Sequence, residues 1–343
     1  KCGAGKRSGR DRQTLQRCEL LMDNRGRVKS VFSWEGGLIH LACAGIYSAD
    51  DLAVDISQLE ECKRLLKNKV SVFSNFRGNI RPAVASIMAT SENPEDSLDD
   101  GLFLYELLKK DFWSSEYLVL AAMVLAKLAK QEEYREIVAR TRRIYKLMQA
   151  EHPFLTSKED SAFCAFLALS EKADERLILE MEGCYRILKK NFTSADAVQQ
   201  SLCEVLVLCG SSPEDKCEKV VELYQYLKEE GCRYGTRNEL PILGILALEN
   251  GSAQQKARLI CEIDEWLAKQ RGFGALGSIS RKQRAMYAAV LAEREFGVDE
   301  NSLVQTAAVS GILSAIIAQE TAMYAAISAS IAASCVVTSS ASN

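Results

Sequence analysis

Apolar residues recur along most of the chain at intervals of three and four, the spacing that one face of an α-helix requires. Alternation with a period of two, typical of a strand, is clear only in the run VSVFSNF at 70–76. Asn93 and Ser212 each precede a proline, so their side chains can cap a helix that the proline begins. These patterns predict an all-α chain.

The helix signals also fall into pairs, which begin near residues 95, 132, 173, 213 and 253. The segments LYELLKKDFWSS (104–115) and CYRILKKNFTSA (184–195) share one pattern, and tyrosines follow the same period of about 40 residues at Tyr105, Tyr145, Tyr185 and Tyr224. Pairs of this length are typical of HEAT and armadillo repeats, in which each pair buries its apolar face against the next. We therefore expect helix-pair repeats in an α-solenoid-like or α/α-superhelical array. The alternative is a globular all-helical array whose spacing is coincidental.

The chain divides by composition into three segments. Residues 1–30 form a basic N-terminal segment, with nine Lys and Arg against three Asp and Glu, and we expect it to be partly disordered or atypical. Residues 31–296 form the helical repeat body, and residues 301–343 form an Ala/Ser-rich helical tail.

The overall charge and the cysteines narrow the class of protein. A net charge of −3 excludes an overall basic nucleic-acid binder, so no specific nucleic acid is expected. Most of the cysteines lie inside apolar helical patterns, and no C-x-x-C occurs in the sequence. Buried free thiols are typical of a reducing compartment. No apolar run follows the basic start, so no signal peptide is visible and a cytoplasmic protein is expected.

Several stretches resemble one family when they are taken in order: FSNFRGN (73–79), HPFLTSKEDSAF (152–163), EGCYRILKKNF (182–192) and IIAQETAMYAA (316–326). They resemble a bacterial family of uncharacterised proteins, the domain of unknown function family numbered 4003, from about Val31 to Val337. The resemblance implies a helical cytosolic protein of bacteria. It implies no substrate.

Two stretches carry the candidate binding residues. In FSNFRG, Arg77 stands where the pattern changes from β-like to helical, beside Phe73 and Phe76. Arg77 can bind a carboxylate or phosphate, or it can bond the last carbonyls of a neighbouring helix. His152 ends a helical pattern, and Asp160 could reach back to it, either to orient a base or to pin the turn. These five residues are candidate contacts with a ligand or partner, and none is assigned a catalytic role.

Other motifs do not predict a cofactor or a metal. GFGALG (272–277) fits G-x-G-x-x-G, but no alternating strands exist to build a dinucleotide-binding sheet, so we expect a connection between helices. His40 and Cys43 lie one helical turn apart, and two groups do not complete a zinc site.

The tail has a seam of large side chains when it is drawn as a helix. The seam consists of Val309, Leu313, Ile316, Glu320, Met323, Ile327 and Ile331. Small residues fill the opposite side, which favours close packing on protein. We expect the tail to be buried in an oligomer or against the repeat body. A weak membrane-associated segment and a flexible low-complexity tail are the alternatives.

Together these patterns favour a non-enzymatic interaction or scaffold protein with a self-associating C-terminal helix. A protein partner or a homo-oligomer is expected. Two alternatives are an enzyme with a site near Arg77, His152 and Asp160, and a peripheral membrane protein that attaches through the tail.

Overall fold

The computed structural model describes residues 9–49, 51–151, 160–192, 196–208, 210–232, 240–273, 279–293 and 295–296. Within these ranges the chain is all-helical and contains no strand, which confirms the predicted class. The run at 70–76, whose sequence alternates like a strand, is a loop that leads into a single 3-10 turn, η1 (Asn75–Arg77). The described residues contain no strand with which it could pair. A second 3-10 turn, η2 (Gln131–Glu133), precedes the helix that begins at Tyr134.

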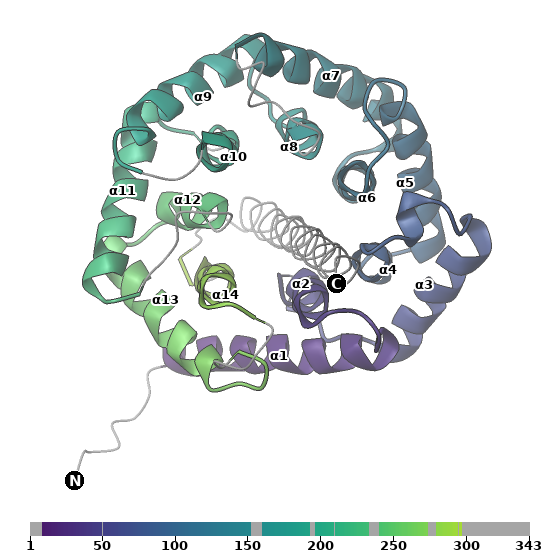
Figure 1. The fold of residues 1–343 in the computed structure, drawn as a ribbon, viewed down its shortest axis with the longest axis horizontal. Coiled ribbons are helices and arrows are strands. Elements are labelled where there is room, and N and C mark those ends of the chain that lie inside the picture. The colour runs from purple at the N-terminus through teal and green to yellow at the C-terminus, as the bar shows by residue number, and fades with distance from the viewer. Residues whose placement is uncertain are drawn as a thin grey trace, which may run out of the picture.

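The helices form two concentric layers around one axis, and successive helices alternate between them (Figure 1). The outer layer consists of α1 (Gly9–Val31), α3 (Ile56–Lys69), α5 (Pro94–Leu108), α7 (Tyr134–Glu151), α9 (Asp174–Leu188), α11 (Pro213–Glu229) and α13 (Ala253–Ala268). The inner layer consists of α2 (Gly37–Ala49), α4 (Arg81–Ala89), α6 (Glu116–Leu128), α8 (Asp160–Leu167), α10 (Asp196–Leu206), α12 (Leu240–Leu248) and α14 (Arg281–Glu293). Each outer helix packs on the inner helix that follows it and on the next outer helix.

The two layers follow from two kinds of apolar pattern. Outer helices are amphipathic, and α7 buries one stripe at helical spacing: Tyr134, Ile137, Val138, Thr141, Ile144 and Met148. Two of the inner helices, α6 and α12, are apolar on nearly every side. All residues from Leu240 to Ala247 of α12 are buried, as are all those from Tyr117 to Leu125 of α6. A helix without a polar face is stable in water only where protein surrounds it, so these segments form the inner layer.

Side chains cap the helices where the sequence predicts them. The Asn93 side chain accepts hydrogen bonds from the backbone N–H groups of Glu95 and Asp96, and Ser212 accepts one from Asp215. From α5 onward the outer helices begin at residues 94, 134, 174, 213 and 253. These starts lie within two residues of the predicted ones, because caps and first-turn prolines act locally.

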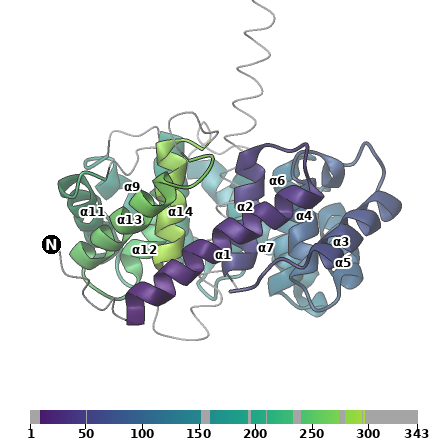
Figure 2. The ribbon, with the colours of Figure 1, turned by 90° about the horizontal axis from the view of Figure 1, so that it is seen from below.

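The ring closes between its first and last helices. Arg17 of α1 donates a hydrogen bond of 2.6 Å to Glu295, just beyond α14. Arg25 of α1 donates to the carbonyl of Arg271 at 2.7 Å and lies over the ring of Phe273. Seen from the side, α1 crosses the rim obliquely between α13 and α3, whereas α2 and α14 stand upright (Figure 2). Residues 9–31, which composition sets apart as part of a basic segment, therefore belong to this ring as α1.

The cysteines of the described ranges are free, and all of them except the half-buried Cys261 are buried. The prediction of buried thiols is confirmed for these residues. Burial raises the pKa of Cys43 to about 12 and that of Cys164 well above its ordinary value, so both are inert apolar groups at neutral pH.

Candidate functional site

The connections from α1 to α2, from α3 to α4 and from α5 to α6 lie side by side and form one face of the ring. Hydrogen bonds link the second of these connections to its neighbours. Asn75 donates to Ser114 at 2.8 Å and to Tyr105 at 2.9 Å, and the backbone N–H of Asn79 donates to Glu116 at 2.7 Å. We call the part of this face formed by residues 32–36, 70–80 and 109–115 the aromatic face.

Each connection of the aromatic face carries one large aromatic side chain that is exposed to solvent. Trp34 is 98% exposed, Phe73 is 95% exposed and Trp113 is 77% exposed. They come from three consecutive helix pairs and are separated in sequence by 39 and 40 residues. Val72, next to Phe73, is also exposed. Large apolar side chains in water cost free energy, so three of them at matching positions make this face a candidate binding surface.

Each connection also holds a buried aromatic ring near the exposed one, and this ring fixes its position. Phe76 meets Tyr105 of α5 edge-on, with ring centroids 5.3 Å apart. Phe112 meets Tyr145 of α7 in the same way, at 5.2 Å. In both cases a connection is tied to the outer helix of the following pair, and such contacts contribute beyond simple burial. The tyrosines that recur in the sequence are therefore the surfaces on which these connections pack.

The first connection is fixed by cations. Phe32 is buried, with Lys63 of α3 5.0 Å from its ring centroid and the guanidinium of Arg81 5.7 Å away. Arg81 also pairs with Glu35, and buried His40 of α2 lies 2.6 Å from the carbonyl oxygen of Phe32. Burial lowers the pKa of His40, so the ring is neutral and donates to that carbonyl. The exposed Trp34 thus stands on a rigid base.

Among the residues singled out from the sequence, Phe73, Phe76 and Arg77 lie together in the second connection. Phe73 points into solvent, and Phe76 is fully buried. Arg77 donates to the carbonyl oxygens of Val70 at 3.3 Å and Lys67 at 3.5 Å, at the C-terminal end of α3. This is the helix-end contact that the sequence left open as one of two roles for Arg77.

Asp160 lies elsewhere in the ring. It is the first residue of α8 and is buried, and α5 and α6 stand between its helix pair and the connection that holds Arg77 (Figure 1). His152 lies outside the described residues, and so do the seam residues of the tail from Val309 to Ile331.

Trp34 and Trp113 are the members of the aromatic face that sequence reasoning missed. Both follow a buried phenylalanine within two residues, and Trp34 lies in SWEGG while Trp113 lies in FWSS. Their spacing from Phe73 equals the period of the helix pairs. The signal available in the sequence was this shared spacing, together with the small and polar residues that follow each tryptophan.

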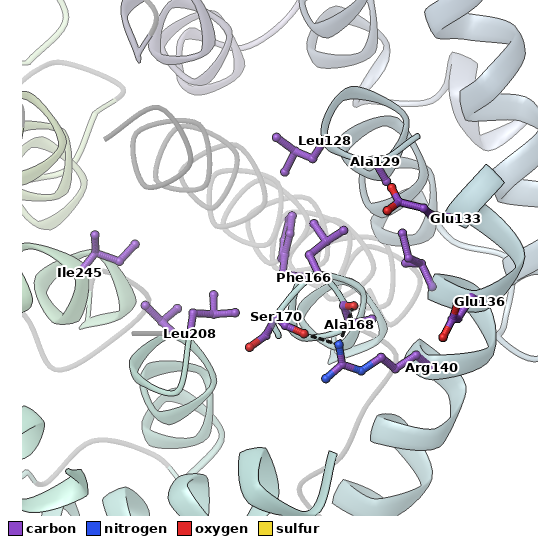
Figure 3. Close-up of a pocket in the computed structure, with 13 residues that line it drawn as sticks. Leu128, Ala129, Glu133, Glu136, Arg140, Phe166, Ala168, Ser170, Leu208 and Ile245 are labelled. Atoms are coloured by element: carbon purple, nitrogen blue, oxygen red, sulfur yellow. Dashed lines mark hydrogen bonds between the residues drawn. The ribbon is translucent and has the colours of Figure 1, made fainter. Parts of the chain in front are cut away.

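A cavity of about 460 Å³ lies inside the ring, on the side away from the aromatic face. Its apolar wall consists of Leu128 at the end of α6, Phe166 near the end of α8, Leu208 beyond α10 and Ile245 of α12 (Figure 3). Glu133 and Glu136 lie at its rim together with Arg140 and Ser170.

Arg140 is fully engaged at this cavity. Its Nε donates to Asp174 at 2.7 Å, and its terminal nitrogens donate to the carbonyls of Ala168, Ser170 and Lys172. Burial alone would raise the pKa of Asp174, but hydrogen bonds from Arg140 and Arg143 outweigh it and lower that pKa. Arg140 therefore holds the connection from α8 to α9 in place. Among the described residues no group of three or more His, Cys, Asp or Glu side chains could hold a metal ion.

Comparisons with known proteins identify a family and no function. Within the described ranges, none of the helices combines the length and apolar character that crossing a bilayer requires. No curated protein and no solved structure matches the chain. Residues 25–322 match the family described as "Protein of unknown function (DUF4003)", which is most of the sequence. The chain belongs to the DUF4003 family.

Proposed function

We propose that this protein is a non-enzymatic interaction protein and that its partner binds the aromatic face. The observation that supports the proposal is the exposure of Trp34, Phe73 and Trp113 at matching positions of three consecutive helix pairs. Binding surfaces are enriched in tryptophan and phenylalanine, and truncation of a few such side chains removes most of the binding energy. Here a buried ring anchors each connection, so little ordering entropy of the backbone is lost on binding.

We also propose that the helix pairs are structural repeats. The support is a contact that recurs between successive pairs: Phe76 with Tyr105, Phe112 with Tyr145, and Phe192 with Tyr224 at 4.9 Å. In a repeat of this kind, the corresponding connections of successive pairs lie at the same height along the ring axis. The exposed aromatic side chains can then contact one partner surface together.

The enzyme alternative near Arg77, His152 and Asp160 has weaker support. The guanidinium of Arg77 bonds two backbone carbonyls, and a whole helix pair separates it from Asp160. Because the Arg77 guanidinium already bonds the end of a helix, it is a poor candidate for reversible binding of a substrate.

Self-association through the tail remains part of the proposal. Large apolar side chains of the inner layer, among them Leu128, Phe166 and Ile245, line the interior cavity and offer a surface for an apolar segment of this chain or of a second copy. Light scattering should compare the full chain with Leu313→Asp/Ile327→Asp. A fall in mass supports self-association, and an unchanged monomer in both rejects it. The tail could also reach a membrane, which liposome binding of the same pair of proteins would reveal.

Site-specific photo-cross-linking tests the aromatic face. Benzoylphenylalanine should replace Trp34, Phe73 or Trp113 in turn, in cells of the source organism, with Leu179 and Phe103 replaced as controls. The controls are exposed apolar residues of the outer helices α9 and α5. We expect the same protein or lipid adduct from all three face positions and none from the controls. Adducts that are absent, or equal at all five positions, would overturn the proposal.

A further inference from the structure

We propose that the partner of the aromatic face is an anionic lipid surface, an inference that rests on the proposed function. Trp34, Phe73 and Trp113 would enter the interfacial layer of the lipid, where amphipathic and aromatic rings are favoured. Lysines between them would lie at the level of the headgroups.

The first argument is geometric. The three aromatic residues occupy matching connections of consecutive helix pairs, and neighbouring connections are bonded to each other through Asn75 and Ser114. The three side chains therefore belong to neighbouring connections on one face of the ring. Side chains that project from one face can enter a lipid surface together, and a lipid surface needs no complementary pockets.

The second argument is the exposure of the individual side chains. Trp34 and Phe73 are exposed almost as fully as in an extended chain, so each stands alone at the tip of its loop. At a protein interface, dominant residues fill pockets and are surrounded by a rim of neighbouring contacts that excludes water. Isolated tips need no such rim when the medium they enter is itself fluid and apolar.

The third argument is charge. Residues 62–91, which contain the connection with Phe73, include six Lys and Arg and no Asp or Glu, although three of the six, Arg64, Lys69 and Arg81, pair with carboxylates outside this range. Three exposed lysines lie next to these connections: Lys29 in the last turn of α1, Lys67 in the last turn of α3 and Lys110 two residues beyond α5. Basic residues close to an anionic membrane are attracted to its surface potential.

The acidic groups of the same face are occupied. Glu35 pairs with Arg81, and Asp111 pairs with Arg142 at 2.8 Å. Glu116 accepts the backbone N–H of Asn79 at 2.7 Å. Exposed lysines therefore accompany the aromatic side chains of this face, while its carboxylates are engaged.

A single-stranded nucleic acid also combines negative charge with a preference for aromatic rings. Stacked bases of one strand follow each other at about 3.4 Å, whereas packed helices lie about 8–10 Å apart. The aromatic rings belong to connections between different helix pairs, so their spacing does not match a stacking platform. This partner is retained as an outcome of the test.

Vesicle binding measures the inference directly. Co-sedimentation should compare phosphatidylcholine vesicles with vesicles that contain phosphatidylglycerol, using the full chain and Trp34→Ser/Phe73→Ser/Trp113→Ser. Phe103→Ser/Leu179→Ser is the matched control, and thermal unfolding confirms that all three proteins are folded. We expect the full chain and the control to bind the anionic vesicles with affinities within threefold of each other. The triple variant should bind at least tenfold more weakly, because each large apolar side chain removed from water accounts for more than a factor of ten.

Two further variants assign the contact. Lys67→Glu/Lys110→Glu should weaken binding to anionic vesicles and make it less sensitive to salt. Leu313→Asp/Ile327→Asp in the tail should leave binding unchanged.

Three outcomes would overturn the inference: no binding to phosphatidylglycerol vesicles, binding that survives the triple substitution, or binding that only the tail substitutions remove. Tight binding of a single-stranded oligonucleotide without vesicle binding would also overturn it. If the lipid inference fails while photo-cross-linking captures one protein from the aromatic face, the proposed function stands. If both experiments fail, neither proposal stands.

Discussion

Glu180 of α9 carries the sharpest prediction about stability, because it neutralises a lysine that has no contact with solvent. Lys216 of α11 is fully buried, and its Nζ lies 2.9 Å from Glu180 Oε2. Lys172 lies 2.7 Å from the same oxygen and also donates to the carbonyl of Val207 beyond α10. Arg176 bonds the other carboxylate oxygen at 3.0 Å. Glu180→Gln keeps the shape of the side chain and removes its charge.

The expected cost is about 3–5 kcal/mol of unfolding free energy, the usual effect of leaving a buried charge without its partner. The pKa of Glu180 gives a consistent magnitude. Burial alone would raise it, but hydrogen bonds from Lys172, Lys216 and Arg176 lower it from 4.5 to about 2. A shift of this size corresponds to about 3 kcal/mol. Because the folded pKa is the lower one, this stability is present above pH 4.5 and is lost as the pH falls toward 2.

Urea unfolding at pH 7 measures the effect, with Glu175→Gln as the control because Glu175 is exposed on the same helix. The control should change the unfolding free energy by less than about 0.5 kcal/mol. The double variant Glu180→Gln/Lys216→Met should be more stable than Glu180→Gln alone, since it removes the uncompensated cation. A cost below about 1 kcal/mol for Glu180→Gln, or a double variant no more stable than the single one, would refute the reasoning.

Three other predictions test the ring and its connections. Phe112→Ala should lower the unfolding free energy by about 3–5 kcal/mol because the ring is buried against Tyr145. Phe73→Ala should change it by less than about 0.5 kcal/mol because that ring is exposed. Urea unfolding of both variants tests which ring is buried. Glu295→Gln should weaken ring closure by removing the closer of the two carboxylates that pair with Arg17. Hydrogen exchange should then rise in α1 more than in α7, and equal changes in both helices would contradict closure at this point. Because Lys256 of α13 is buried, the free energy of unfolding should increase as the pH rises from 8 toward 10. Burial lowers its pKa from 10.5 to about 8, so the unfolded chain binds more protons in this interval, and the rise should be absent from Lys256→Met in pH-dependent urea unfolding.

The candidate site was only partly visible in the sequence. The stretch FSNFRG contains two phenylalanines in similar surroundings, and nothing local distinguishes Phe73, which is in solvent, from Phe76, which is fully buried. The difference comes from Tyr105, which lies on another helix and offers its ring to only one of them. Arg77 is decided in the same way, because its partners are the end carbonyls of α3.

The sequence by itself determined the helices and their order. Caps at Asn93 and Ser212, first-turn prolines and apolar spacing act within a few residues, so the helical class and the starts of the outer helices could be predicted. The tyrosines spaced by 40 residues marked the contacts between successive pairs. Only the tertiary structure decided that the array closes, through contacts such as Arg17 with Glu295 across 278 residues of sequence. Closure depends on the sum of small rotations from one pair to the next, and no local pattern encodes that sum.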